Sequence, residues 1–209
     1  DPPEHLASDQ LDGHVFRHQD YPHGFSLLLD LAYTRLFIPH LRLAGVKDAI
    51  VDLTYSEHLM PDGRHLRMQH HVPLGDRVLC AYDTLDWLPC QPRGTRYLML
   101  TVRNMRQDVT LQEFSLRGAN YPAPRIGRFT CSDPVLTAVW DMGRRTEQAN
   151  REDAYDDCVG RERGMYIRDT IIQYHVNLAC FGDHALMRRC FELYGQSPDD
   201  SGKFRAVYP

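Results

Sequence analysis

The stretch A-N-Y-P-A-P-R-I-G-R-F, residues 119–129, separates two halves of the chain that follow different hydrophobic periods. Its two prolines and its glycine fit neither the interior of a strand nor that of a helix, so it is predicted to be a linker. Before it apolar residues recur at every second position, and after it at every third and fourth. We therefore predict a domain over residues 1–118, a linker over 119–131 and a second domain over 132–209.

The half before the linker consists of short extended segments between turn residues. Residues 97–102 form an apolar run suited to a buried strand. The apolar positions of 109–116 change phase after Leu111, which predicts either a bulge or a break in that strand. Several such segments with no helical stretch between them favour an antiparallel β-sandwich over an α/β fold. One further set of alternating apolar residues predicts another strand: Ala49, Val51, Leu53 and Tyr55.

The first helical run after the linker begins at a capping signal. Ser132 is predicted to cap it, with Asp133 and Pro134 in the first turn, and the run extends to about Asn150. An apolar face of this kind is typical of a helix that packs against a core. The apolar residues at helical spacing are Val135, Leu136, Val139, Trp140 and Gly143.

Two further helical runs follow. One is predicted to begin near Ile167, and the other to follow Asp183 as its cap and to stop at Gly195. Three helices are few to bury so many apolar faces. We therefore expect the chain to be the front part of a longer protein.

Composition excludes several classes of partner. The chain has 209 residues and a formal net charge of −4, with acidic and basic residues scattered, so it lacks the basic stripe that binds nucleic acid. No apolar run approaches the roughly 20 residues that cross a bilayer, and the first ten residues do not resemble a signal peptide, so a soluble chain is expected. The six cysteines form no C-x-x-C pair, which leaves the compartment open.

The segment D-D-C-V-G-R-E-R-G-M-Y-I-R-D, residues 156–169, lies in the connection of about fifteen residues between the first two helical runs. Connections of this length in compact domains are usually functional or disordered. Gly160 and Gly164 permit sharp turns on either side of Glu162, which predicts a projecting tip with a carboxylate at its centre. A folded loop brings Asp157, Glu162 and Asp169 around one cavity, where clustered carboxylates raise one another's proton affinity and suit a general acid.

Other readings of the charged residues stay open. The same residues also suit structural ion pairs that tie down a loop. A metal site and a cofactor are not expected, because three nearby arginines oppose a cation and no nucleotide-binding motif is present. His65, His70 and His71 have poor spacing for metal ligands and are expected to lie in a solvated loop.

The pattern D-x-Y-D-D-C-x-x-R-E-R-x-x-Y-x-x-D, residues 153–169, resembles the signature of the α-L-rhamnosidases of glycoside hydrolase family 78. Upstream, G-R-F-T-C-S-D-P-V-L-T-A-V-W is similar to that family's entry into an (α/α)6 barrel. Y-S-E, D-W-L-P and R-Y-L-M-L resemble the β-sandwich that precedes the barrel. The resemblance implies a jelly-roll-like sandwich followed by the first helices of the barrel, as a fragment of a longer chain.

The resemblance also implies the chemistry. Such enzymes are inverting, with an acid and a base carboxyl about 6.5 to 9.5 Å apart. By motif position Glu162 is the general acid, Asp157 and Asp169 hold sugar hydroxyls, Arg161 orients the carboxylates and Tyr166 stacks on the sugar. The base is expected in a later helix outside these residues, and the expected partner is a carbohydrate.

Three positions depart from the family pattern. Val159 stands where the family usually has proline, Tyr166 where it has tryptophan, and Arg168 where it has glycine. Arg168 suits either an ion pair with Asp169 or recognition of an acidic sugar. Two alternatives therefore remain: a carbohydrate-binding or structural module, and a related six-hairpin glycosidase or lyase acting on another sugar.

Overall fold

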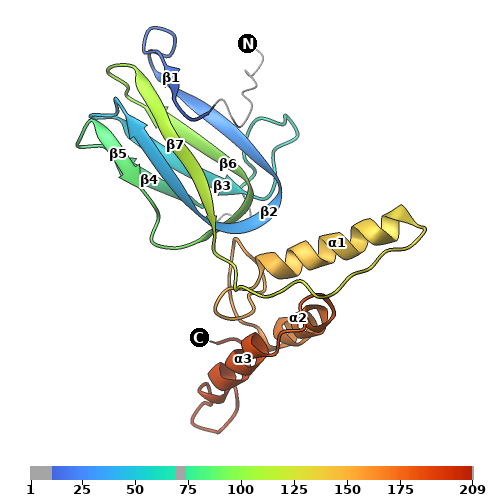
Figure 1. The fold of residues 1–209 in the computed structure, drawn as a ribbon. Helices are drawn as coiled ribbons and strands as arrows, with labels where there is room; N and C mark the ends of the chain where they lie inside the picture. Colours follow the sequence, from blue (N-terminus) through green and yellow to red (C-terminus); the bar gives the residue numbers. More distant parts are fainter. Residues whose placement is uncertain (1–10, 69–73, 209) are drawn as a thin grey trace. The chain divides into compact units, whose positions relative to one another are not determined.

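The computed structural model describes residues 11–68 and 74–208. The chain divides into two compact units, Asp1–Gly118 and Ala119–Pro209 (Figure 1). Among the described residues, no helix is long and apolar enough to cross a membrane. The strands of the first unit are β1 (His14–Phe16), β2 (Gly24–Ala44), β3 (Ile50–Ser56), β4 (Gly75–Leu79), β5 (Thr84–Trp87), β6 (Arg93–Arg103) and β7 (Val109–Gly118). The helices of the second unit are α1 (Pro134–Ala149), α2 (Ile167–Cys180) and α3 (Ala185–Gly195).

The first unit is an antiparallel β-sandwich in which β2 belongs to both layers (Figure 1). The first part of β2 pairs with β6, which pairs with β3, which pairs with β4. The last part of β2 lies between β7 and β5, and β1 pairs with the outer side of β7. Buried side chains from both sets of strands form a single apolar core. The predicted antiparallel sheet is therefore confirmed.

An irregularity in β2 allows this strand to pass from one layer to the other. Its register against β6 shifts between Asp30 and Arg35. Within this interval Ala32 has a φ of 66°, and its N–H donates to Asp30 Oδ1 at 2.8 Å. Extra residues in one strand of an antiparallel pair bend it and increase its twist, as β2 requires here.

The predicted strand patterns are confirmed in part. The alternating residues of β3 point into the core, where Val51 and Leu53 are each 1% exposed. The register of β2 on β7 jumps from Glu113 to Leu111, which confirms the predicted bulge. The run over residues 97–102 is buried on one face only, because its alternate residues on the other face are half-buried.

The cap of α1 differs from the prediction. The N-cap is Asp133, whose Oδ1 accepts a hydrogen bond from the backbone N–H of Val135 at 2.8 Å, so the prediction of Ser132 is wrong. The reason is Pro134, which occupies the first helical position and disfavours helical dihedral angles in the residue before it. That residue is Asp133, which has extended dihedral angles and an oxygen placed to accept.

The other two helices follow the prediction closely. α2 begins at Ile167, and α3 ends at Gly195. His184 occupies the boundary position of α3, but it makes no side-chain cap hydrogen bond. The carboxylate of Asp183 accepts from the backbone N–H groups of Ala185 and Leu186 at 3.1 and 3.3 Å, which confirms its capping function.

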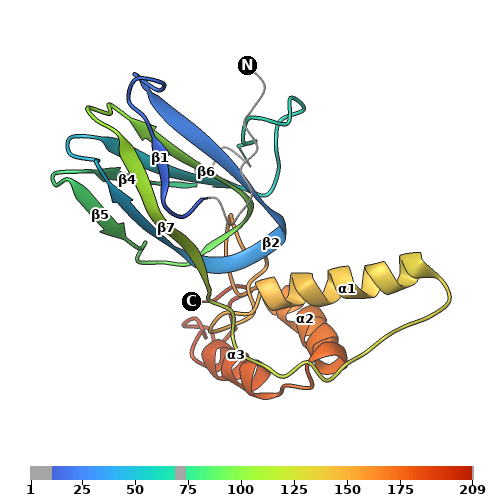
Figure 2. The same ribbon diagram turned by 45° about the horizontal axis from the view of Figure 1, so that its top comes forward.

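Residues 119–131 lie within the helical unit and run antiparallel to α1 (Figures 1 and 2). Near the end of α1, Asn120 Nδ2 donates to the carbonyl of Gln148 at 2.6 Å. Near its start, the rings of Phe129 and Trp140 are 5.6 Å apart. Gly127 is required between these points, because a Cβ there would lie 1.9 Å from the carbonyl oxygen of Ala179.

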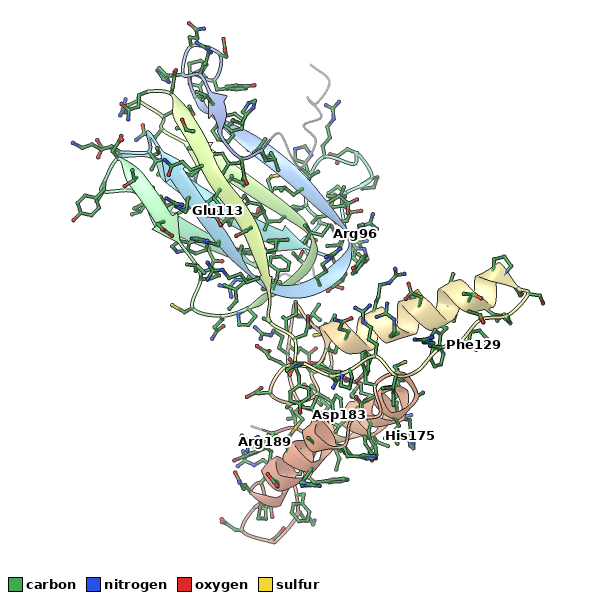
Figure 3. All side chains as sticks on the ribbon, in the orientation of Figure 1. Arg96, Glu113, Phe129, His175, Asp183 and Arg189 are labelled. Atoms are coloured by element: carbon green, nitrogen blue, oxygen red, sulfur yellow. The ribbon has the colours of Figure 1, made fainter. Side chains whose placement is uncertain are left out.

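Much of the apolar face predicted for α1 is exposed. Val135 is 65% exposed and Leu136 52%, whereas Trp140 is half-buried beside Phe129, which is labelled in Figure 3. Within the described residues this face is thus largely uncovered, in line with the expectation that three helices are few to bury so many apolar faces.

Replacing Asp133 by Ala is expected to lower the free energy of unfolding of the helical unit by about 1 kcal/mol, because the N–H of Val135 loses its acceptor. Ser132→Ala is the matched control and is expected to change it by less than about 0.5 kcal/mol. Urea unfolding followed by circular dichroism at 222 nm compares the two variants. A larger loss in Ser132→Ala than in Asp133→Ala would contradict the assigned cap.

Candidate active site

The connection between α1 and α2 folds into two successive closed turns. In the first, the backbone N–H of Asp156 donates to the carbonyl of Asn150 at 2.9 Å. In the second, Asp157 N–H donates to the carbonyl of Gly164 at 3.0 Å, and the Gly164 N–H returns a hydrogen bond to Asp157 Oδ1 at 2.9 Å. Residues 158–163 therefore form a short tip closed at its base by Asp157 and Gly164.

The backbone of this tip differs from the prediction at its glycines. Arg163 has a φ of 50°, whereas neither Gly160 nor Gly164 is among the residues with positive φ. A left-handed conformation costs a residue with a side chain roughly 1–2 kcal/mol. Gly164 serves a different purpose, because a Cβ there would lie 3.0 Å from Cε2 of Tyr166.

Glu162 lies at the surface of the tip, where two other predicted site residues contact its carboxylate. The Tyr166 hydroxyl donates to Glu162 Oε2 at 2.8 Å, and the Arg161 guanidinium forms an ion pair with Glu162 Oε1. The side chain of Glu162 is 36% exposed, so its carboxyl is open to solvent while held from two sides. Three of the five predicted site residues therefore contact one another directly.

The other two predicted residues are placed differently. Asp157 is half-buried at the base of the tip, and one of its carboxylate oxygens is occupied by the Gly164 N–H. Asp169 lies in the first turn of α2, where the helix dipole favours a negative charge. Within residues 11–68 and 74–208, no hydrogen bond or ion pair joins Asp169 to Glu162 or to Arg168.

A buried layer of ionisable groups lies beneath the tip. Arg151 is 1% exposed; its guanidinium donates to Asp183 Oδ2 at 3.3 Å and lies 4.5 Å from the ring centroid of Phe181. Figure 3 labels Asp183 beside the start of α3. Burial raises the pKa of Glu147 to about 8, although the charge of Arg151 opposes this shift.

Asp156 and Glu152 complete this layer. Burial and the negative charge of Glu152 together raise the pKa of Asp156 to about 7, although the charge of Arg163 opposes this shift. Glu152 in turn forms an ion pair with Arg163. Glu147, Arg151 and Glu152 were not predicted as site residues. The spacing of Glu147 and Arg151 was a usable signal, because residues four apart are neighbours on a helix and α1 ends at Ala149, just before Arg151.

Other candidate ligands do not gather into a site. Among the described residues, no three His, Cys, Asp or Glu side chains are placed to hold a metal ion. His65 is exposed, with Nδ1 2.5 Å from Asp62 Oδ2, whereas His70 and His71 lie outside the described residues. All six cysteines are free thiols.

Comparison with known proteins identifies what the chain resembles. Residues 124–209 match the family model of the bacterial alpha-L-rhamnosidase 6 hairpin glycosidase domain. No curated protein matches the sequence. The resemblance to the α-L-rhamnosidases of glycoside hydrolase family 78 is confirmed by this match together with those of solved structures.

Three solved structures are similar over 88% of this chain. The family 78 rhamnosidase of Bacillus sp. GL1 is 27% identical with a TM-score of 0.81, and the match covers 19% of that chain. A rhamnosidase from Klebsiella oxytoca with rhamnose bound is 21% identical with a TM-score of 0.72, over 38% of its chain. The alpha-L-rhamnosidase of Dictyoglumus thermophilum is 11% identical with a TM-score of 0.70, over 21% of its chain. The present chain thus spans between 19% and 38% of the length of these proteins.

The buried carboxyl of Glu147 makes stability depend on pH. Because its pKa is raised to about 8 in the folded protein, folded chains keep a proton that unfolded chains release, so stability falls as pH rises from about 4.5 to 8. Glu147→Gln removes this contribution and is expected to reduce the loss between pH 5 and 8 by on the order of 3 kcal/mol. A smaller decline remains from Asp156, whose pKa of about 7 acts in the same direction.

Urea unfolding of the helical unit at pH 5 and pH 8 measures this loss. Glu192→Gln is the control, because Glu192 is an exposed residue of α3. An unchanged pH dependence in Glu147→Gln would show that Glu147 is ionised in the folded protein.

Proposed function

We propose that this chain is part of a glycoside hydrolase that cleaves terminal α-L-rhamnosides with inversion, and that Glu162 is its general acid. Two observations support the proposal. The chain resembles family 78 rhamnosidases, and Glu162 is held at the tip of a closed loop by Arg161 and Tyr166. The position of Glu162 carries the proposal, because a proton donor must lie within reach of the substrate with its direction fixed.

The proposed reaction includes two proton transfers, one to the glycosidic oxygen and one from the attacking water. The carboxyl of Glu162 gives its proton to the glycosidic oxygen as the bond from that oxygen to the anomeric carbon breaks. Water attacks the opposite face of the anomeric carbon, and a carboxylate base outside this chain takes the proton of that water. The sugar is then released as the β anomer, which proton NMR of freshly formed product detects; release of the α anomer would exclude inversion.

The remaining predicted residues are proposed to bind the sugar. Asp157 has one oxygen engaged by Gly164, which leaves Oδ2 to accept from a sugar hydroxyl. Asp169 is proposed to accept from another hydroxyl at the start of α2. Tyr166 is proposed to stack its ring on the sugar while its hydroxyl holds Glu162, and Arg161 orients the same carboxyl.

We also propose that the three helices are the first of an (α/α)6 barrel, after a sandwich domain over residues 1–118 and a linker over 119–131. The exposed apolar residues of α1, among them Val135 and Leu136, would pack against later helices of such a barrel. The solved rhamnosidases are several times longer than this chain, which is consistent with further helices. The general base would lie on one of them.

Glu162→Gln is expected to lower kcat of the full-length protein on an alkyl α-L-rhamnoside by about 10²- to 10⁴-fold, because Gln cannot donate the proton that an alcohol leaving group needs. Glu192→Gln, an exposed residue of α3, is the control and is expected to keep full activity. Release of free rhamnose measures both variants. Full activity in Glu162→Gln would contradict the role of Glu162, and an inactive wild-type protein would contradict the choice of substrate.

A further inference from the structure

Glu152 and Arg163 form an ion pair that joins the two turns of the connection between α1 and α2. Glu152 lies before the tip and Arg163 lies within it, next to Glu162. Their side chains are 21% and 22% exposed, so both charges are largely withdrawn from solvent. Charge pairs of this kind are screened less by salt and water than those at an open surface.

The backbone of Arg163 is unusual for a residue with a side chain. Its φ of 50° lies in the left-handed region, which glycine adopts without strain. Gly160 lies in the tip and Gly164 at its base, yet the left-handed residue is the arginine. Strained conformations persist where surrounding contacts hold them, and the ion pair of the Arg163 side chain with Glu152 is one such contact.

The direction of Arg163 bears on its neighbour. The Arg163 side chain leaves the tip toward Glu152, whereas the adjacent Glu162 side chain leaves it toward Tyr166 and Arg161. If the left-handed turn at Arg163 relaxed, the peptide that follows Glu162 would rotate and the Glu162 side chain would change direction. The contact between Tyr166 and Glu162 depends on that direction.

Asp156 supports the pair from the other side. It is 7% exposed, and its proximity to Glu152 contributes to raising its pKa. The neutral form of Asp156 is the form that can donate to the carboxylate of Glu152, because only a protonated carboxyl is a donor. Glu152 is therefore held between Asp156 and Arg163, which restricts its freedom to release Arg163.

We infer that Glu152 is a positioning residue for Glu162: it holds Arg163 in its left-handed conformation and thereby aims the Glu162 carboxyl. The inference rests on the proposed role of Glu162 as proton donor. It adds a chain of three side chains, Asp156, Glu152 and Arg163, that acts on the reaction without touching the sugar.

The test measures kcat and KM of the full-length protein on an alkyl α-L-rhamnoside. Glu152→Gln is expected to lower kcat by about 10- to 100-fold with KM changed less than about twofold, because a misdirected donor affects the reaction more than binding. Asp153→Asn is the matched control, since Asp153 is an exposed acid in the same connection and is expected to leave both constants unchanged.

A second variant, Arg163→Gly, distinguishes loss of the ion pair with Glu152 from backbone strain at residue 163 and from a general loss of folding. Arg163→Gly allows the left-handed backbone without strain but removes the anchor, so it is expected to keep the melting temperature within a few degrees and to lose kcat as Glu152→Gln does. The exchanged pair, Glu152→Arg with Arg163→Glu, is expected to recover part of the lost kcat. Unchanged kcat in both Glu152→Gln and Arg163→Gly, alongside loss of activity in Glu162→Gln, overturns the inference and leaves the proposed function standing. Unchanged kcat in Glu162→Gln overturns both.

Discussion

Two hydrogen bonds between Asp157 and Gly164 hold the charged tip in shape, and the arrangement around Glu162 depends on them. They close six residues into a tip whose ends are fixed at one point. Gly164 then lies against the ring of Tyr166, so that a Cβ at this position would be only 3.0 Å from Cε2 of the ring. This approach brings the hydroxyl of Tyr166 to the carboxyl of Glu162. Asp157, whose carboxylate is predicted to bind a sugar hydroxyl, is thus also the residue that closes the loop.

Beneath the tip, the charges of the helical unit are arranged so that few are both buried and uncompensated. Arg151 is buried against Phe181 and paired with Asp183, and Asp156 and Glu147 have raised pKa values because burial favours their neutral forms. A neutral carboxyl costs far less to bury than an ionised one. This arrangement lets a segment rich in opposed charges fold into a defined shape, and it leaves Glu162 as the carboxyl presented to solvent at the tip.

The sequence predicted the features that depend on local pattern. Alternation at Val51 and Leu53 identified a strand, the phase change after Leu111 identified a bulge, and Asp183 was identified as a cap. The predicted cap of α1, Ser132, lies one residue before the observed cap. The capping pattern alone does not include the constraint that Pro134 puts on the dihedral angles of Asp133.

Features that depend on contacts through space were not predictable from one sequence. Glycine is the natural choice for a sharp turn, but Arg163 adopts the left-handed conformation, and its side chain pairs with Glu152 eleven residues before it. The number of helices predicted that some apolar faces are left uncovered, but periodicity alone does not show that Val135 is among the exposed residues. The motif placed Glu162 in a family pattern, and only the fold shows its contacts with Tyr166.

The central claim is that Glu162 gives a proton to the leaving group. The most direct test is how the loss of activity in Glu162→Gln depends on the leaving group. In the full-length protein, kcat/KM of Glu162→Gln relative to the wild type is measured on α-L-rhamnosides of alcohols and of acidic phenols. A leaving group of low pKa departs without a proton, so the defect is expected to be large for alcohols and to shrink by about 10-fold or more for acidic phenols. An equal defect across the series would contradict proton donation by Glu162.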